Sequence, residues 1–191
     1  MNRQSLFFNP FTKIAGWQAL LWGLAGLVIS AIIGYAAKTH YHGMLNFGIA
    51  FNNSAWLFFA ERFVVWLVPA IILYIAGLIF SKSGIRPVDV FGTMAFAQLP
   101  LIAMNPLTMP IMKMGYERFI NSTKGLPDDS NLFVTVILSI FLVLFLVMAL
   151  IWMFNAAKVS CNLKGWKLWV SYLLAIIGGD VLCRIIISAM Y

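Results

Sequence analysis

The chain has 191 residues, of which 62% are hydrophobic and only 10% are charged. Its mean hydropathy is +0.92, and soluble domains are about 45–50% apolar and about 25% charged, so this composition excludes a soluble globular domain. The net charge of +7 comes from Lys and Arg residues scattered between apolar stretches. That distribution is expected from membrane topology and does not predict binding to nucleic acid.

Five apolar stretches predict an all-α, multi-pass membrane bundle that forms a single domain over residues 1–191. The predicted spans cover about residues 14–37, 63–80, 90–112, 132–157 and 168–191. At ~1.5 Å per residue each crosses a hydrocarbon core of ~30 Å, the second only just. The second span extends back to Ser54 if Glu61 and Arg62 lie at the interface. The stretches lack the polar–apolar alternation of a membrane β-barrel.

The connection 38–62 is the longest one expected outside, and it is rich in aromatic residues. We expect 44–59 to lie along the membrane interface. His40 and His42 stand two residues apart, and two histidines need a further ligand to hold zinc well. Glu61 is a third ligand on paper only, so a solvated histidine pair is the expected state.

The third predicted span contains Pro100, Pro106 and Pro110. Because proline in a helix interior removes a hydrogen bond, we expect a bend at Pro100 and unwinding near Pro106. A broken helix that carries Gln98 and Asn105 is a pointer to a transport site. The alternative is a kinked helix whose amides bond to neighbouring helices.

Small residues predict which helix faces pack, because they let membrane helices approach closely. They recur every four residues in the first span (Gly26, Ser30, Gly34) and in the last (Ser171, Ala175, Gly179, Cys183). We therefore expect these faces to point into the bundle, with the first and last helices as neighbours. The fourth span is bulky all round and is expected on the lipid-facing rim.

Asp180 and Arg184 lie in the middle of the last span. A charge at bilayer depth costs roughly 2.5–3.5 kcal/mol on insertion scales, but opposite charges four residues apart share a helix face and neutralise each other in part. The pair is either a functional site, with Gln98 and Asn105 as partners, or a self-contained structural clasp. If the pair is a clasp, Asp180→Ala alone should destabilise the protein more than Asp180→Ala with Arg184→Leu, because the single change leaves a charge without its partner.

Orientation follows from the basic residues in short loops. With the N-terminus inside, the inner segments hold seven Lys or Arg and the outer segments hold five. The loop 155–167 carries three lysines and no acid. The N-terminus is therefore predicted to be cytoplasmic and the C-terminus to be outside.

No catalytic motif, cofactor motif or metal-ligand pattern occurs in the sequence, so no catalytic, cofactor-binding or metal-binding residue is predicted and enzymatic activity is not expected. Cys161 and Cys183 are expected to be free thiols.

Short motifs and the five-span layout resemble a known family. These are Asn9-Pro10-Phe11 followed by Trp17, Phe91 followed by Gln98-Leu99-Pro100, and the basic turn Lys164-Gly165-Trp166-Lys167. The chain resembles the bacterial branch of the Yip1 domain family, small five-span membrane proteins. This resemblance implies a cytoplasmic N-terminus and placement in a bacterial plasma (inner) membrane. The long N-terminal region and the Asp-Leu-Tyr-Gly-Pro motif of eukaryotic members are missing, so a role with Rab GTPases does not carry over.

The expected function is an organising or scaffold role through contacts with lipid, with another membrane protein or with further copies of the chain. The alternative is a small oligomeric transporter or channel with a polar site at Asp180, Arg184, Gln98 and Asn105.

Overall fold

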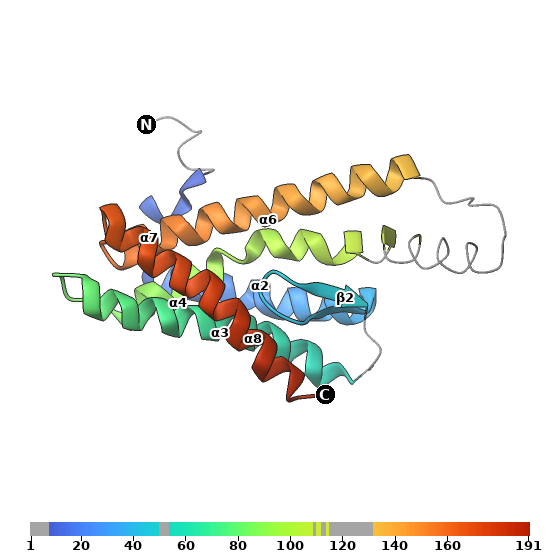
Figure 1. The fold of residues 1–191 in the computed structure, drawn as a ribbon, viewed down its shortest axis with the longest axis horizontal. Helices are drawn as coiled ribbons and strands as arrows, with labels where there is room; N and C mark the ends of the chain where they lie inside the picture. The colour runs from blue at the N-terminus through green and yellow to red at the C-terminus, as the bar shows by residue number, and fades with distance from the viewer. Residues whose placement is uncertain (1–7, 50–53, 109, 112–113, 115–131) are drawn as a thin grey trace.

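The computed structural model describes residues 8–49, 54–108, 110–111, 114 and 132–191. Within them, five helical stretches are long and apolar enough to cross a membrane. They cover Gly16–Ala37, Ala55–Phe80, Pro87–Thr108, Leu132–Ser160 and Gly165–Ser188. The expected five long apolar helices are confirmed and run side by side in an elongated bundle (Figure 1), while a short β-hairpin departs from the expected all-α class.

The first long helix, α2 (Gly16–Ala37), follows a short 3-10 turn, η1 (Pro10–Thr12). Its small face packs on α4 (Pro87–Phe96). A Cβ added at Gly23 would lie 2.4 Å from the Cβ of Ala95, so only glycine permits this approach. The expected pairing of the first and last helices is therefore wrong: α2 packs mainly on α4 and α3, and the last helix mainly on α3.

A β-hairpin follows α2, with strand β1 (Thr39–Tyr41) antiparallel to β2 (Phe47–Ile49). In Figure 1 it folds back alongside α2 rather than leaving the bundle. Residues 42–46 form the hairpin tip, which Asn46 closes by accepting the backbone N–H groups of His42 and Gly43 at 2.9 and 3.2 Å.

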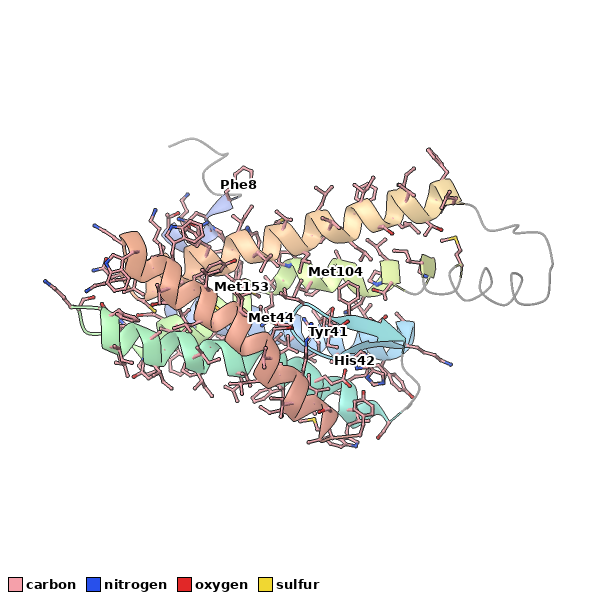
Figure 2. All side chains as sticks on the ribbon, viewed as in Figure 1. Phe8, Tyr41, His42, Met44, Met104 and Met153 are labelled. Carbon is pink, nitrogen blue, oxygen red and sulfur yellow. The ribbon has the colours of Figure 1, made fainter. Side chains whose placement is uncertain are left out.

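The hairpin corrects the expectation of an interfacial segment over 44–59. Tyr41 and Met44 are buried, and Met44 lies in the same apolar core as Met153 (Figure 2). Non-helical backbone at membrane depth is tolerated only where protein covers it or water reaches it. Here β1 is buried throughout and pairs with β2, whose Phe47 and Gly48 are partly buried.

Helix α3 (Ala55–Phe80) begins eight residues before the predicted 63–80 span. Glu61 and Arg62 are inside it and buried, with 0% and 2% of their surface exposed. Inside the bundle Glu61 contacts His40, Tyr41 and Tyr191, and Arg62 lies over the ring of Tyr41. α3 also contains Pro69, against which Gly179 packs.

The third span is interrupted at Pro100 but not at Pro106. Helix α4 ends at Phe96, and a 3-10 segment, η2 (Leu99–Ala103), follows it. Residues 104–108 are helical again. The bend at Pro100 is confirmed. The unwinding near Pro106 is wrong, because Pro106 lies in the first turn of the renewed helix, where its missing N–H leaves no helical bond unmade.

Helix α6 (Leu132–Ser160) lies along the edge of the bundle (Figure 1). Only 11% of its most apolar 18 residues are buried, against 39–61% in the other four spans. The residues it buries are all in its second half: Ala149, Met153, Ala156 and Ala157. The predicted position on the rim is confirmed.

The last span is built from α7 (Gly165–Leu173), a π-helical turn η3 (Leu174–Gly178) and α8 (Gly179–Ser188). Its small stripe of Ser171, Ala175, Gly179 and Cys183 is buried. The stripe therefore faces the bundle as predicted. Both cysteines are free thiols, also as predicted.

Candidate functional site

Buried polar side chains gather around the hairpin at one end of the bundle. They come from α2, β1, α3, the helical residues 104–108 and α8. The members are Ser30, Thr39, His40, Glu61, Arg62, Asn105 and Asp180. This set is called the hairpin network below.

The Glu61 carboxylate is the centre of the hairpin network. One oxygen, Oε1, lies 2.6 Å from Nδ1 of His40, and the other accepts the backbone N–H of Tyr41 at 2.9 Å. The hydroxyl of Tyr191 donates to Oε1 and lies 2.6 Å from the same imidazole nitrogen. The His40 ring stacks on Phe58, with centroids 4.3 Å apart. One carboxylate thus joins α3, β1 and the last residue of the chain.

Tyr191 closes this cluster from the surface, since 55% of the residue is exposed. Burial of its hydroxyl end, together with the hydrogen bond to Glu61, raises the pKa of Tyr191. The phenol therefore stays protonated at ordinary pH and remains a donor to the carboxylate.

Arg62 is the least satisfied member of the hairpin network. Its guanidinium carbon lies 4.1 Å from the ring centroid of Tyr41, a cation–π contact. None of its three side-chain nitrogens has a hydrogen-bond partner in the part of the chain that the structure describes. Buried charged donors without acceptors are costly. The neighbouring Glu61 supplies the compensating charge but no hydrogen bond.

Asn105 fastens the base of the hairpin to α2. Its Oδ1 accepts the hydroxyl of Tyr41 at 2.5 Å. Its Nδ2 donates to the backbone carbonyl and the hydroxyl of Ser30 at 2.9 and 2.8 Å. Thr39 donates to the backbone carbonyl of Asn105 at 3.4 Å.

Asp180 fastens the hairpin tip to α8. Its Oδ2 accepts Nε of Arg184 at 2.8 Å, so the predicted intrahelical pair is present. Its Oδ1 accepts the backbone N–H of Leu45 at 2.9 Å. The Arg184 side chain is half exposed. Asp180 is therefore more than a self-contained clasp, because it also holds a second element.

The four residues expected to form one polar site are not gathered at one point. Asp180 and Arg184 hold the hairpin tip, and Asn105 holds its base. Gln98 donates to the backbone carbonyl of Val65 at 3.0 Å, while its Oε1 has no partner among the described residues. The two amides bond to neighbouring elements, as the kinked-helix alternative for the third span requires.

Sequence reasoning missed Glu61, Arg62 and Tyr191 as members of the site. The signal for the first two was present, since an acid and a base stand next to each other in an apolar run that starts at Ser54. The expected solvation of the histidine pair is wrong for His40, which is 1% exposed, and right for His42, which is exposed. Across the described residues, no three His, Cys, Asp or Glu side chains are placed to hold a metal ion.

Comparison with known proteins returns no matching family model, no matching curated protein and no matching solved structure. The resemblance to the Yip1 domain family therefore gains no support from these comparisons.

Proposed function

We propose that this chain is an integral membrane protein that acts through contacts with other membrane proteins, lipids or further copies of itself, in an organising or scaffold role. The observation that supports it is the sparse packing of α6. Its first half is apolar except for Thr135 and Ser139, and its buried residues all lie in its second half. A helix this poorly packed in the monomer has most of its surface available to a partner helix or to lipid.

One face of that half carries a shallow groove of about 350 Å³. Thr135 and Ser139, four residues apart, bring small polar side chains into it. Small residues at this spacing favour close helix–helix approach in membranes. This is the face on which we expect a partner helix to lie.

The test is a purification from native membranes in mild detergent, followed by mass spectrometry of what is retained. Ser139→Phe fills the groove, and Ile79→Phe places the same bulk on an exposed site of α3 as the control. We expect a protein partner or a homo-oligomer of fixed mass that Ser139→Phe loses and Ile79→Phe keeps. A monomer with no reproducible partner for the wild type would contradict the scaffold role.

A small oligomeric transporter or channel is the second candidate, and Arg62 favours it. A buried guanidinium that finds no acceptor among the described residues, beside a carboxylate that bonds an imidazole, is the kind of intramembrane charge that marks ion and solute pathways. Gln98, whose Oε1 has no partner in the described part of the chain, is a second unsatisfied group in the bundle. Flux of an anion or of protons in liposomes that Arg62→Gln abolishes would support this candidate. Impermeable liposomes would count against it.

The proposed topology keeps the N-terminus in the cytoplasm and the C-terminus outside, in a bacterial plasma membrane. Because Arg62 is buried in the bundle, it no longer counts among the five Lys or Arg of the outer segments. Seven basic residues in the inner segments then stand against four (5 − 1) in the outer ones. A cysteine in place of Ser83 should react with membrane-impermeant maleimide only after the cytoplasmic side is opened. Labelling of Ser83→Cys in intact cells would reverse the orientation.

A further inference from the structure

A lateral groove opens between α2, α3 and α4, beside the first residues of α2 and α4. It encloses about 700 Å³. Its walls are apolar or aromatic side chains, among them Leu20, Leu24, Trp66 and Phe91, and its single charged lining residue is Arg86. A long apolar slot with one cation at its end is complementary in charge and shape to an amphiphile with an anionic head.

We propose that this groove binds one anionic phospholipid, with its phosphate at Arg86 and one acyl chain along the slot. The inference rests on the membrane placement of the chain and not on the scaffold or transporter role. The lipid site can therefore be disproved without disproving the scaffold or transporter role, and the reverse also holds.

Arg86 is placed to receive a headgroup. It directly precedes α4, where the chain returns to the bundle, and 69% of its side chain is exposed. Its ion pair with Asp89 is long, at 3.4 Å, and exposed pairs of this kind contribute little. A Cβ added at Gly16 would lie 3.8 Å from Nη2 of Arg86, so the guanidinium stands beside the first residue of α2.

The same end of the bundle adds to the positive potential there. α2 and α4 both begin at this end, and helix N-termini favour anions within their first turn, where Asp89 is the one acidic residue of α4. Lys13 precedes Gly16 by three residues. Trp17, at the mouth of the groove, is 67% exposed, as is common for tryptophan at the level of lipid headgroups.

The slot is deep enough for an acyl chain. From Trp17 to Leu24 is seven residues of α2, or ~10 Å. A second cavity of about 270 Å³ shares Leu24 and continues along α2 to Ala31, with Arg62 as its one charged lining residue. The full distance from Trp17 to Ala31 is ~21 Å, which exceeds the ~15 Å of half a hydrocarbon core. A chain anchored at Arg86 that follows both cavities would therefore cross its whole leaflet along the protein.

The floor of the groove is built before any ligand arrives. The indole N–H of Trp66 donates to the backbone carbonyl of Phe91 at 3.0 Å, and their rings meet edge to face at 6.3 Å. This fixes α3 against α4 at the base of the slot. A preformed site loses little freedom on binding, which favours retention of a lipid through purification.

Lipid binding is tested by native mass spectrometry of the full chain in detergent, with dioleoyl phosphatidylglycerol or phosphatidylcholine added at equal concentration. We expect the wild type to retain the anionic lipid about tenfold better, the gain from one charge-assisted contact. Arg86→Gln should remove this preference, and Leu20→Trp should reduce binding of both lipids by filling the slot. Lys82→Gln, an exposed cation of the same loop that does not line the groove, is the matched control.

Equal retention of the two lipids by the wild type, or an unchanged preference in Arg86→Gln, would overturn the proposal. Glycerol 3-phosphate, which has the charge but no chains, should not displace the bound lipid. If it does, the groove is not the acyl site. The protein partner sought with Ser139→Phe should be unaffected by Arg86→Gln, so the two proposals fail independently.

Discussion

Replacing the Glu61 carboxylate is the sharpest perturbation of the hairpin network. Glu61→Gln keeps the shape but removes the charge that accepts hydrogen bonds from Tyr41 and Tyr191 and pairs with His40. It also leaves the buried guanidinium of Arg62 without an adjacent negative charge. Each hydrogen bond to a charged group contributes ~1.5–3 kcal/mol, and breaking a buried ion pair costs ~3–5 kcal/mol.

These terms overlap because the same atoms make them, so we expect a total loss of ~3–5 kcal/mol in the free energy of unfolding. For a chain of this size that lowers Tm by ~6–20 °C. A thiol-reactive dye measures Tm in mild detergent, because Cys161 and Cys183 are buried until the protein unfolds. Tyr172→Phe is the control, since it removes one hydrogen bond, to the carbonyl of Leu150, outside the hairpin network; it should cost ~1 kcal/mol.

A second variant separates charge from packing. Glu61→Gln with Arg62→Gln removes both buried charges, so it should be clearly less damaging than the sum of the two single changes. If Glu61→Gln is no worse than Tyr172→Phe, or if the double variant shows simple additivity, the buried charges do not stabilise the hairpin.

Three further outcomes follow from the packing of the hairpin and the loops. Gly43→Ala should lower Tm and loosen the hairpin tip, because its Cβ would lie 2.7 Å from Oδ1 of Asp180, whereas Gly84→Ala, with nothing within 4 Å, should be neutral. Asp180→Ala with Arg184→Leu should recover only part of the loss caused by Asp180→Ala, since the hairpin-tip N–H stays unpaired in both variants; full recovery in the thermal melt would show that this bond contributes nothing. Burial raises the pKa of the Cys161 thiol, so its alkylation at pH 8, followed by mass spectrometry, should be slow until detergent denaturation, and rapid labelling of the folded protein would refute its buried placement.

The long spans were predictable because an uninterrupted apolar run of this length has few alternatives to a membrane helix. The start of α3 was predicted only as the alternative that extends the second span back to Ser54. Glu61 and Arg62 looked too costly for a helix interior when only the bilayer was considered as their surroundings. Inside the bundle, His40, Tyr41 and Tyr191 replace water, and none of these partners is close to the pair in sequence.

The sequence also contains no pattern from which the hairpin could be predicted. Its strands are three residues each, and their stability depends on Asn105 and Asp180, which come from distant helices. The small residues of α2 identified a packing face correctly but carried no information about the partner, since a glycine accommodates any close backbone. The bend at Pro100 was predictable because its cause is local.

The most direct test of the account is a cross-link between the hairpin tip and α8. A Cβ at Gly43 would lie 3.0 Å from Cγ of Arg184, the position that the sulfur of a cysteine at 184 would take. Gly43→Cys with Arg184→Cys therefore brings the two side chains within reach of a disulfide, whose Cβ atoms are ~3.5–4.5 Å apart. With Cys161→Ala and Cys183→Ala as background, mild oxidation in the membrane should give an intramolecular disulfide detectable by peptide mass spectrometry. Gly84→Cys with Arg184→Cys, at the far end of the bundle, should give none. If instead Gly43→Cys stays reduced and reacts readily with a water-soluble maleimide, while its Tm equals that of the parent protein, the tip lies in solvent and the hairpin does not enter the bundle.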